Sequence, residues 1–299
     1  MAIVRRFVGL CLVLVLLLWG SEARAGRLAD RLAQFPHWES KAPVSAAEGD
    51  LIYPDWMEGT WNVTSTLVEQ VAPLAPEVVT PGFESNRRYL NQPVSFLVRF
   101  HPKNDPLRLS SSATQTAISD RVAGRYRVLR FVPLKIPSSP PSPLPSPGKS
   151  LTVVADRAFN GLNIAQAYLG DRTILSVKVD PSSPNRQITF LRTGRQLVSI
   201  VTGRASETPA PSRFIATEVS NQVFRGTSQP YFNQVETTTA YQLVRPALDS
   251  SNTLRSPTIE ADQVTAVYLS PQDADYFKAL DRPVALYRYR LDLSRVEPT

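Results

Sequence analysis

Two glutamates come closest to forming an acid–base pair in this sequence. Glu218 and Glu236 lie in neighbouring strand-like runs, residues 213–224 and 231–244. If the two runs form a hairpin, the carboxylates fall in the same region of the ladder. Glu236 is out of phase with the apolar Val235, so two solvent-exposed glutamates are the simpler interpretation. An enzyme that uses paired carboxylates is therefore the third of the three functions that we consider.

The sequence offers few residues for other catalytic or metal chemistry. It contains two histidines, His37 and His101, and a single cysteine, Cys11. A closed zinc site needs more Cys or His ligands than these, and no loop clusters the Asp and Asn residues that calcium requires. No serine lies in a Gly-x-Ser-x-Gly motif, and no glycine-rich phosphate loop is present. We therefore expect no catalytic residue, no metal and no cofactor.

Hydroxyl side chains occur among aliphatic ones on the strand faces that we expect to point inward. A barrel lined in this way holds a small apolar or amphipathic ligand, and the hydroxyls fix its orientation. A filled interior in which the hydroxyls bond one another or buried water is the alternative. The candidate ligand-binding residues are Thr189, Ser199, Thr237, Thr239, Tyr241, Glu218 and Glu236.

Most of the chain is predicted to form the strands that position these residues. From Gly59 the apolar residues recur with a period of two, with Trp61, Val63 and Leu67 on one face. Asn160-Gly161 is expected to turn the chain between two strands. Many short strands with close turns favour a mostly β fold, an antiparallel barrel, over parallel pairing. After the strand that begins at Gly59, strands are expected at residues 94–101, 151–156, 162–169, 173–180, 186–191, 197–204, 213–224, 231–244, 259–269 and 284–293.

Two helices are expected outside the sheet. Residues 26–35 carry Leu28 and Leu32 at helical spacing, and Pro36 ends the pattern. Residues 270–280 begin with Ser270 as a cap, followed by a proline in the first turn. The second helix precedes the last strand and is expected to cover one end of the barrel.

The first 25 residues are predicted to be a cleavable signal peptide. Arg5-Arg6 precedes an apolar core, and Ala23-Arg24-Ala25 is a small-x-small cleavage site. The mature chain, residues 26–299, is then an exported single domain that contains no cysteine and is stabilised by its core rather than by disulfides. Cleavage removes three arginines and one glutamate, so the net charge falls from +7 to +5. Residues 137–149 are rich in Pro and Ser, which predicts a loop insertion.

The tripeptide Gly59-Thr60-Trp61 resembles the opening motif of the lipocalin-like (calycin) barrels. In those barrels the tryptophan packs at the closed end and often stacks under an arginine from the last strand. The resemblance therefore implies a structural role for Gly59 and Trp61, with Arg288 or Arg290 above the indole ring in a cation–π contact.

Several segments resemble an uncharacterised family of cyanobacterial and plastid proteins. They include Leu28-Ala29-Asp30-Arg31-Leu32, Asp156-Arg157-Ala158-Phe159-Asn160 and Tyr268-Leu269-Ser270-Pro271-Gln272-Asp273. The resemblance implies residence in the periplasm or the thylakoid lumen and a barrel related to lipocalins, and it carries no activity or site.

Three functions follow from these observations. We expect first a non-enzymatic protein that binds a small apolar or amphipathic ligand such as a lipid, pigment or quinone. The alternative is an interaction or assembly factor for a membrane complex, including a photosynthetic one, without a ligand. Nucleic acid is not an expected partner, because the positive charge is mild and forms no dense Lys/Arg run.

Overall fold

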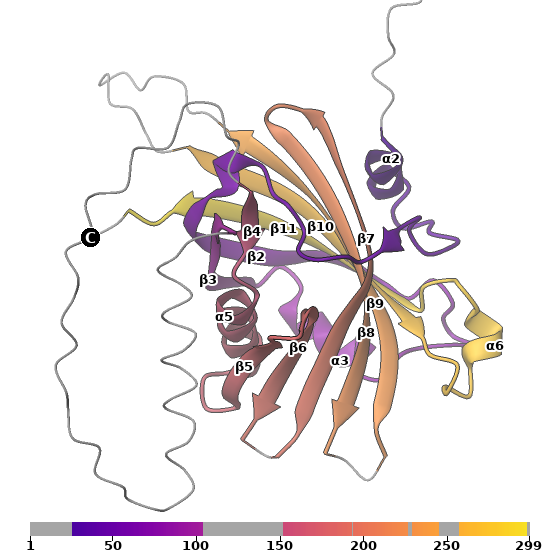
Figure 1. Ribbon diagram of the computed structural model, residues 1–299. Helices are drawn as coiled ribbons and strands as arrows, with labels where there is room; N and C mark the ends of the chain where they lie inside the picture. Colours follow the sequence, from indigo (N-terminus) through magenta and orange to yellow (C-terminus); the bar gives the residue numbers. More distant parts are fainter. Residues whose placement is uncertain (1–25, 104–151, 193, 227–228, 245–256, 298–299) are drawn as a thin grey trace, which may run out of the picture.

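Most of the described chain belongs to one curled antiparallel β-sheet (Figure 1). The computed structural model describes residues 26–103, 152–192, 194–226, 229–244 and 257–297. The expected signal peptide, residues 1–25, and the expected loop at residues 137–149 lie outside the described residues. The mostly β, antiparallel class predicted from the sequence is confirmed.

The strands are long, and the helices are few and mostly short. The strands are β1 (Ser45–Ala46), β2 (Gly59–Val71), β3 (Pro93–Pro102), β4 (Val153–Ala155), β5 (Ile174–Asp180), β6 (Ser183–Leu191), β7 (Gln196–Ala210), β8 (Arg213–Arg225), β9 (Tyr231–Val244), β10 (Thr258–Leu269) and β11 (Ala285–Arg295). The helices are α2 (Arg27–Ala33), α3 (Phe83–Asn86), α5 (Arg157–Leu169) and α6 (Tyr276–Ala279), and the 3-10 turns are η1 (Asp55–Met57) and η2 (Arg87–Tyr89).

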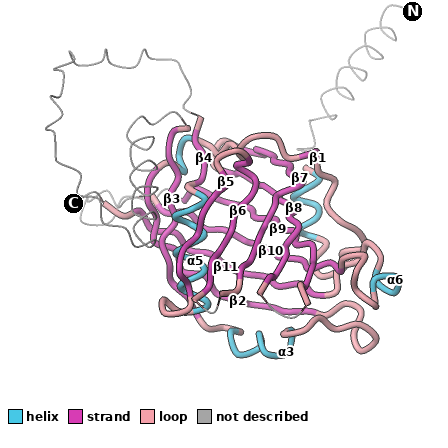
Figure 2. The backbone as a smooth tube through the Cα atoms, turned by 60° about the horizontal axis from the view of Figure 1, so that its bottom comes forward, coloured by secondary structure: helices cyan, strands magenta, loops and turns pink. Residues whose placement is uncertain are grey.

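The sheet curls into a half-barrel whose two ends are β4 and β5. Its order is β4-β3-β2-β11-β10-β9-β8-β7-β6-β5, with β1 beside β7. The strands from β5 to β11 pair as a meander, and β2 then pairs with β11. Among the described residues β4 and β5 are not paired with each other. Helix α5 contacts both β3 and β5, so it lies in the gap between the two ends (Figures 1 and 2).

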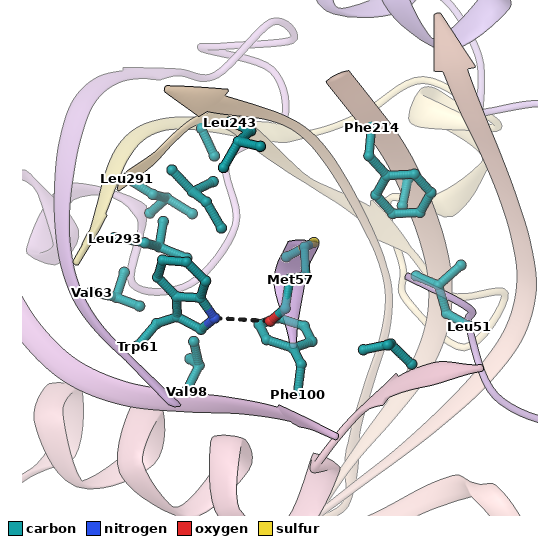
Figure 3. Close-up of a cluster of buried hydrophobic side chains, with 14 residues drawn as sticks. Leu51, Met57, Trp61, Val63, Val98, Phe100, Phe214, Leu243, Leu291 and Leu293 are labelled. Carbon is teal, nitrogen blue, oxygen red and sulfur yellow. Dashed lines mark hydrogen bonds between the residues drawn. The ribbon is translucent and has the colours of Figure 1, made fainter. Parts of the chain in front are cut away.

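The concave face of the sheet carries the larger apolar cluster. Along β2, burial alternates with the period of a strand, and Trp61 and Val63 are almost fully buried. Phe100, Phe214 and Leu293 from β3, β8 and β11 join them in one cluster. The period-two pattern that begins at Gly59 therefore contributes Trp61 and Val63 to this buried cluster, as Figure 3 shows.

The convex face is covered in part by α2. Leu28 and Leu32 pack from the helix against Ile215 and Val264 of the sheet, and all four side chains are buried. The sheet is therefore apolar on both faces at this place, and α2 with the segment after it keeps water from the outer face.

A buried ion pair joins α2 to the convex face. Arg31 Nε lies 2.5 Å from Glu236 Oε1, and Arg31 Nη2 donates to Tyr268 Oη at 3.0 Å. The second oxygen of Glu236 accepts from the Ala42 amide at 2.9 Å. The guanidinium stacks on the Trp38 ring at 3.8 Å from its centroid. Because the Glu236 side chain is fully buried, these donors replace the water that its charge would otherwise need.

The structure differs from the sequence prediction most clearly between residues 156 and 169. The predicted strand at residues 162–169 and the predicted turn at Asn160-Gly161 are both wrong, because these residues belong to α5. Asp156 caps the helix by accepting a hydrogen bond from the Phe159 amide at 3.3 Å. In the expected helix at residues 270–280, only the four residues of α6 are helical.

The buried pair predicts a large loss of stability when one partner is neutralised. Glu236→Gln leaves the Arg31 guanidinium buried without its counter-charge, and the free energy of unfolding is expected to fall by about 3–5 kcal/mol. Urea denaturation followed by circular dichroism measures the loss. The matched control is Glu84→Gln, which removes the exposed Arg87–Glu84 pair and should cost less than about 1 kcal/mol. Equal effects of the two substitutions would refute the structural role of Glu236.

Candidate functional site

Helix α5 closes the gap in the half-barrel by taking over part of the role of a strand. Asn160 Oδ1 accepts from the Arg99 amide at 2.7 Å, and Asn160 Nδ2 donates to the Arg99 carbonyl at 3.2 Å. The side chain thus satisfies the Arg99 amide beyond the last paired residue of β4, and it shares the Arg99 carbonyl with the Asp156 amide, which donates to it at 2.9 Å. Arg157 Nη1 lies 3.4 Å from Glu218 Oε1, which links the start of the helix to β8.

A cavity of about 260 Å³ lies between α5 and the concave face of the sheet. Apolar side chains form most of its wall, and the polar groups are hydroxyls and amides; no charged residue is among the described side chains that line it. The residues that line it are Tyr53, Val63, Ser65, Phe96, Val98, Phe100, Ala155, Asn160, Ile164, Tyr168, Tyr241, Gln263, Thr265, Tyr289, Leu291 and Leu293.

A hydroxyl pair ties the helix to the sheet at the wall of this cavity. Ser65 Oγ of β2 and Tyr168 Oη of α5 are 3.0 Å apart. Gln263, on another part of the wall, accepts a hydrogen bond through Oε1 from Thr239 Oγ1 at 3.2 Å, and Thr239 itself lies outside the wall. These groups give the cavity both donors and acceptors without a net charge.

The phenols of the cavity stay protonated far above neutral pH. Burial raises the pKa of Tyr241 to about 12 and raises the pKa of Tyr53 well above its ordinary value. Burial likewise raises the pKa of Tyr168 and Tyr289. A phenol in this state donates a hydrogen bond to a carbonyl or ether oxygen but supplies no charge.

A charged cluster lies beside the cavity rather than in its wall. Glu218 Oε1 accepts from Arg204 Nη2 at 2.8 Å as well as from Arg157. Arg204 Nη1 also donates to the Gly49 carbonyl at 2.6 Å. Glu218 thus binds two arginines from β7 and α5 and fastens three elements together.

The register places Glu218 and Glu236 on opposite faces of the sheet. Glu218 pairs with Thr237, whereas Glu236 pairs with Val219, and successive residues of a strand point to opposite faces. The two carboxylates are close along the ladder, as expected, but they do not converge on one site. Glu236 belongs to the convex face under α2 and is not part of the cavity.

The five hydroxyl residues predicted to bind a ligand all lie on the concave face. The register aligns Thr237 and Thr239 with the cavity residues Thr265 and Gln263 of β10. Tyr241 lines the cavity directly. Thr189 and Ser199 share this face farther along the sheet, on β6 and β7. Of the predicted set, only Tyr241 is in the cavity wall.

Sequence reasoning missed several residues of the wall for an identifiable reason. Asn160, Ile164 and Tyr168 reach it from α5, which was predicted as a turn and a strand. Ser65 shares the period-two phase of Trp61 and Val63 in the strand that begins at Gly59, and Tyr289 alternates in the same way with Leu291 and Leu293 in the last strand. The period of two along the strands therefore indicated Ser65 and Tyr289, whereas it could not indicate the three wall residues of α5.

Trp61 lies under an arginine of the last strand, but not under the predicted one. The Arg295 guanidinium is 5.7 Å from the centre of the indole ring, and the indole nitrogen donates to the Met57 carbonyl at 2.8 Å (Figure 3). Arg288 instead forms a bidentate pair with Asp262, and Arg290 is exposed. The register explains the correction, because Arg295 is the residue of β11 opposite Trp61.

The position of Arg295 beside Trp61 favours glycine at residue 59. Its φ is +123°, a conformation that side chains rarely adopt, and a Cβ there would lie 3.2 Å from Arg295 Nη2. Among the predicted closure residues, Gly59 and Trp61 therefore meet at this end of the interior, together with Arg295.

Within the described part of the chain, no group of three or more His, Cys, Asp or Glu side chains is placed to hold a metal ion. The same residues include no helix with the length and apolar character needed to cross a membrane.

The fold and the cavity define a curled antiparallel β protein with a neutral internal site. The chain belongs to the family described as a domain of unknown function (DUF6816), whose model matches residues 45–297. The predicted membership in an uncharacterised family is thus confirmed. Comparisons with curated proteins and with solved structures give no match.

The contact between α5 and β3 predicts that Asn160 matters more than its neighbour Asn163. Asn160→Ala removes the acceptor of the Arg99 amide and one of the two donors to the Arg99 carbonyl, and it should lower the free energy of unfolding by about 1–3 kcal/mol. Asn163→Ala removes one bond to the Phe159 carbonyl within the same helix and is expected to cost less. Urea denaturation of both variants measures the difference. A smaller loss for Asn160→Ala than for Asn163→Ala would contradict the role given to α5.

The buried phenols predict an alkaline limit to stability. Their pKa is higher in the folded protein than the value of about 10 for an exposed tyrosine, so the folded state holds these protons more tightly. The resulting stability is complete below about pH 10 and is lost as the pH rises toward 12. Tyrosinate absorbance and circular dichroism, recorded together, should therefore change in one steep step. Titration of the same tyrosines near pH 10 with the fold intact would contradict the prediction.

Proposed function

We propose that the protein binds a small uncharged molecule in the cavity between α5 and the sheet and does not transform it. The observation that carries the proposal is a wall of apolar side chains, neutral phenols and amides with no charged residue among its described members. Such a wall stabilises an apolar body that carries one or two hydrogen-bond acceptors.

The volume of the cavity limits the size of this molecule. A dry cavity of about 150 Å³ is enough for benzene. The cavity found here, of about 260 Å³, therefore has room for a substituted ring or a short chain. A long pigment would leave most of its surface outside, so we favour a quinone or a similar cyclic carbonyl compound over the other expected ligands.

The hydrogen-bonding groups also favour a carbonyl compound. The Tyr168–Ser65 pair provides one polar point on the wall, and Gln263 provides another. Tyr241 and Tyr289 add phenols that do not ionise at neutral pH. Neutral donors bind carbonyl oxygens, whereas a carboxylate ligand would leave its charge without a counter-ion.

The arrangement supports binding more than catalysis. Glu218 lies on the concave face beside the cavity, and its Oε1 accepts hydrogen bonds from two arginines. Glu236 is on the other face of the sheet. Among the described residues, no pair of carboxylates lines the cavity, and this supports binding over acid–base catalysis.

The alternative role as an assembly factor has one observation in its favour. Phe277 and Leu280, at α6, are 81% and 53% exposed. Two large apolar side chains at one corner suit a contact with another protein. This reading applies if the cavity proves unable to bind a ligand.

We place the protein after export, in a periplasm or a thylakoid lumen, as the predicted signal peptide and the resemblance to cyanobacterial and plastid proteins support. The half-barrel with Trp61 under Arg295 also supports a relation to lipocalin-like barrels. In such a compartment a neutral quinone is an available ligand.

The first experiment is an organic extract of the protein purified from its native compartment, analysed by absorbance and mass spectrometry. A near-stoichiometric small neutral molecule is expected. Recovery of a long-chain pigment or a charged ligand would contradict the proposed class. If the extract is empty, the binding of added quinones, measured by titration of the purified protein, decides the question.

Duroquinone, a small neutral quinone, is the first probe, and a benzoquinone sulfonate is its charged counterpart. Quenching of tryptophan fluorescence reports binding, since Trp61 lies in the same apolar cluster as several wall residues. We expect the neutral quinone to bind at least about tenfold more tightly than the sulfonate, because none of the described residues in the wall carries a charge. Tighter binding of the sulfonate would refute a neutral ligand.

Two substitutions on α5 locate the site. Ile164→Trp fills the cavity from its wall and should abolish quinone binding, whereas Leu169→Trp, on the same helix but outside the wall, should leave it unchanged. Tyr168→Phe removes one donor and should weaken binding about fivefold, against no change for Tyr231→Phe. Normal binding to a folded Ile164→Trp variant would show that the ligand is not in this cavity.

A further inference from the structure

A buried carboxylate oxygen at the start of α2 lacks a hydrogen-bond partner. Glu207, on β7, accepts a hydrogen bond from the Leu28 amide through Oε1 at 3.1 Å. It thereby caps a helix whose own N-cap residue, Gly26, has no side chain to do so. The other oxygen, Oε2, is buried, and no hydrogen bond to it occurs among the described residues. A buried carboxylate oxygen without a donor is costly.

Gly26 lies directly against this oxygen. A side chain at position 26 would collide with the Glu207 carboxylate, so the α-carbon of Gly26 is in close contact with it. The α-nitrogen is bonded to that carbon, and standard geometry places it within about 4.5 Å of Glu207 Oε2. Gly26 is also the residue that follows the predicted cleavage site Ala23-Arg24-Ala25.

We propose that cleavage after Ala25 creates an α-ammonium group on Gly26 that forms an ion pair with Glu207 Oε2. Water hydrolyses the Ala25–Gly26 peptide bond under the action of a signal peptidase, which leaves a carboxylate on Ala25 and a protonated amine on Gly26. The inference rests on the proposed export of the protein, but it does not depend on ligand binding in the cavity.

The chemistry of the two nitrogens explains why the pairing needs cleavage. A peptide nitrogen has one hydrogen whose direction the planar bond fixes. An ammonium has three hydrogens that rotate freely, and it carries a full positive charge. A positive charge at the N-terminus of a helix is unfavourable by itself, because the helix dipole is positive there. The Glu207 carboxylate offsets that cost and gains the donor that its Oε2 lacks.

The pair would complete the attachment of α2 to the convex face. The middle of the helix is held through Arg31 and Glu236, and its first turn is held through Glu207. Both carboxylates come from the sheet, on β9 and β7. The processed N-terminus would then be a structural part of the mature fold rather than a free end.

The test exports the full-length chain from a bacterial host and examines the purified product. Intact-mass analysis is expected to show a chain that begins at Gly26. The rate at which a selective reagent labels the α-amino group is then compared between wild type and Glu207→Gln. The ion pair withdraws the amine from its reactive neutral form, so the wild type should react about tenfold more slowly.

The Glu207→Gln variant distinguishes the proposed ion pair from the capping hydrogen bond that Glu207 accepts from the Leu28 amide. Glutamine at position 207 can still accept the Leu28 hydrogen bond, so a merely structural role for Glu207 would leave amine labelling unchanged. Glu207→Gln should also lower the melting temperature by about 2–4 °C, against no shift for the exposed Glu260→Gln. A mature chain that begins at any other residue, or equal labelling rates in the two proteins, would overturn the proposal.

Discussion

The gap between β4 and β5 is the constraint on which the rest of the structure depends. The sheet curls far enough to enclose an interior but leaves its two ends unpaired in the described chain. An open edge strand must be covered or satisfied, and α5 does both. It supplies Asn160 to the backbone of β3, Arg157 to Glu218 and Tyr168 to Ser65. The helix thus completes the half-barrel, and the cavity lies between its inner side and the concave face of the sheet.

The two faces of the sheet handle polar groups in opposite ways. On the convex face a full charge is buried, and Arg31, Tyr268 and the Ala42 amide satisfy Glu236 almost completely. On the concave face the wall of the cavity has no charge among its described residues, and its hydroxyls and amides remain in contact with the space. The first arrangement is typical of a buried ion pair with a structural role. The second is typical of a site that accepts a neutral guest.

Most strands were predictable from the sequence, but the helix α5 that closes the gap between β4 and β5 was predicted as a turn and a strand. A period of two along β2 and β9 places Trp61 and Tyr241 on the concave face because each strand obeys that period by itself. Helix α5 is half-buried on several sides and has no fully buried residue, so it carries no clear apolar stripe. The arginine over Trp61 depends on register, and register is set by long-range pairing between β2 and β11, which places Arg295 there. Local sequence patterns therefore indicated which face of the sheet each strand residue occupies. Contacts between elements distant in the sequence determine which residues form the cavity and which arginine lies over Trp61.

The polarity of the cavity wall is itself an argument for a guest. A half-barrel that needed only stability would gain by filling this space with aliphatic side chains, since burial of apolar surface is the main stabilising term. The wall instead carries Ser65, Thr265 and Gln263 beside phenols whose raised pKa values show how poorly solvated their charged forms would be. Hydroxyls and amides in such a place are costly unless something bonds to them. Ser65 and Tyr168 satisfy each other across the gap, which holds α5 at the distance that keeps the cavity open. The neutral molecule that we propose would accept hydrogen bonds from phenols of the wall such as Tyr289 and would cover its apolar part.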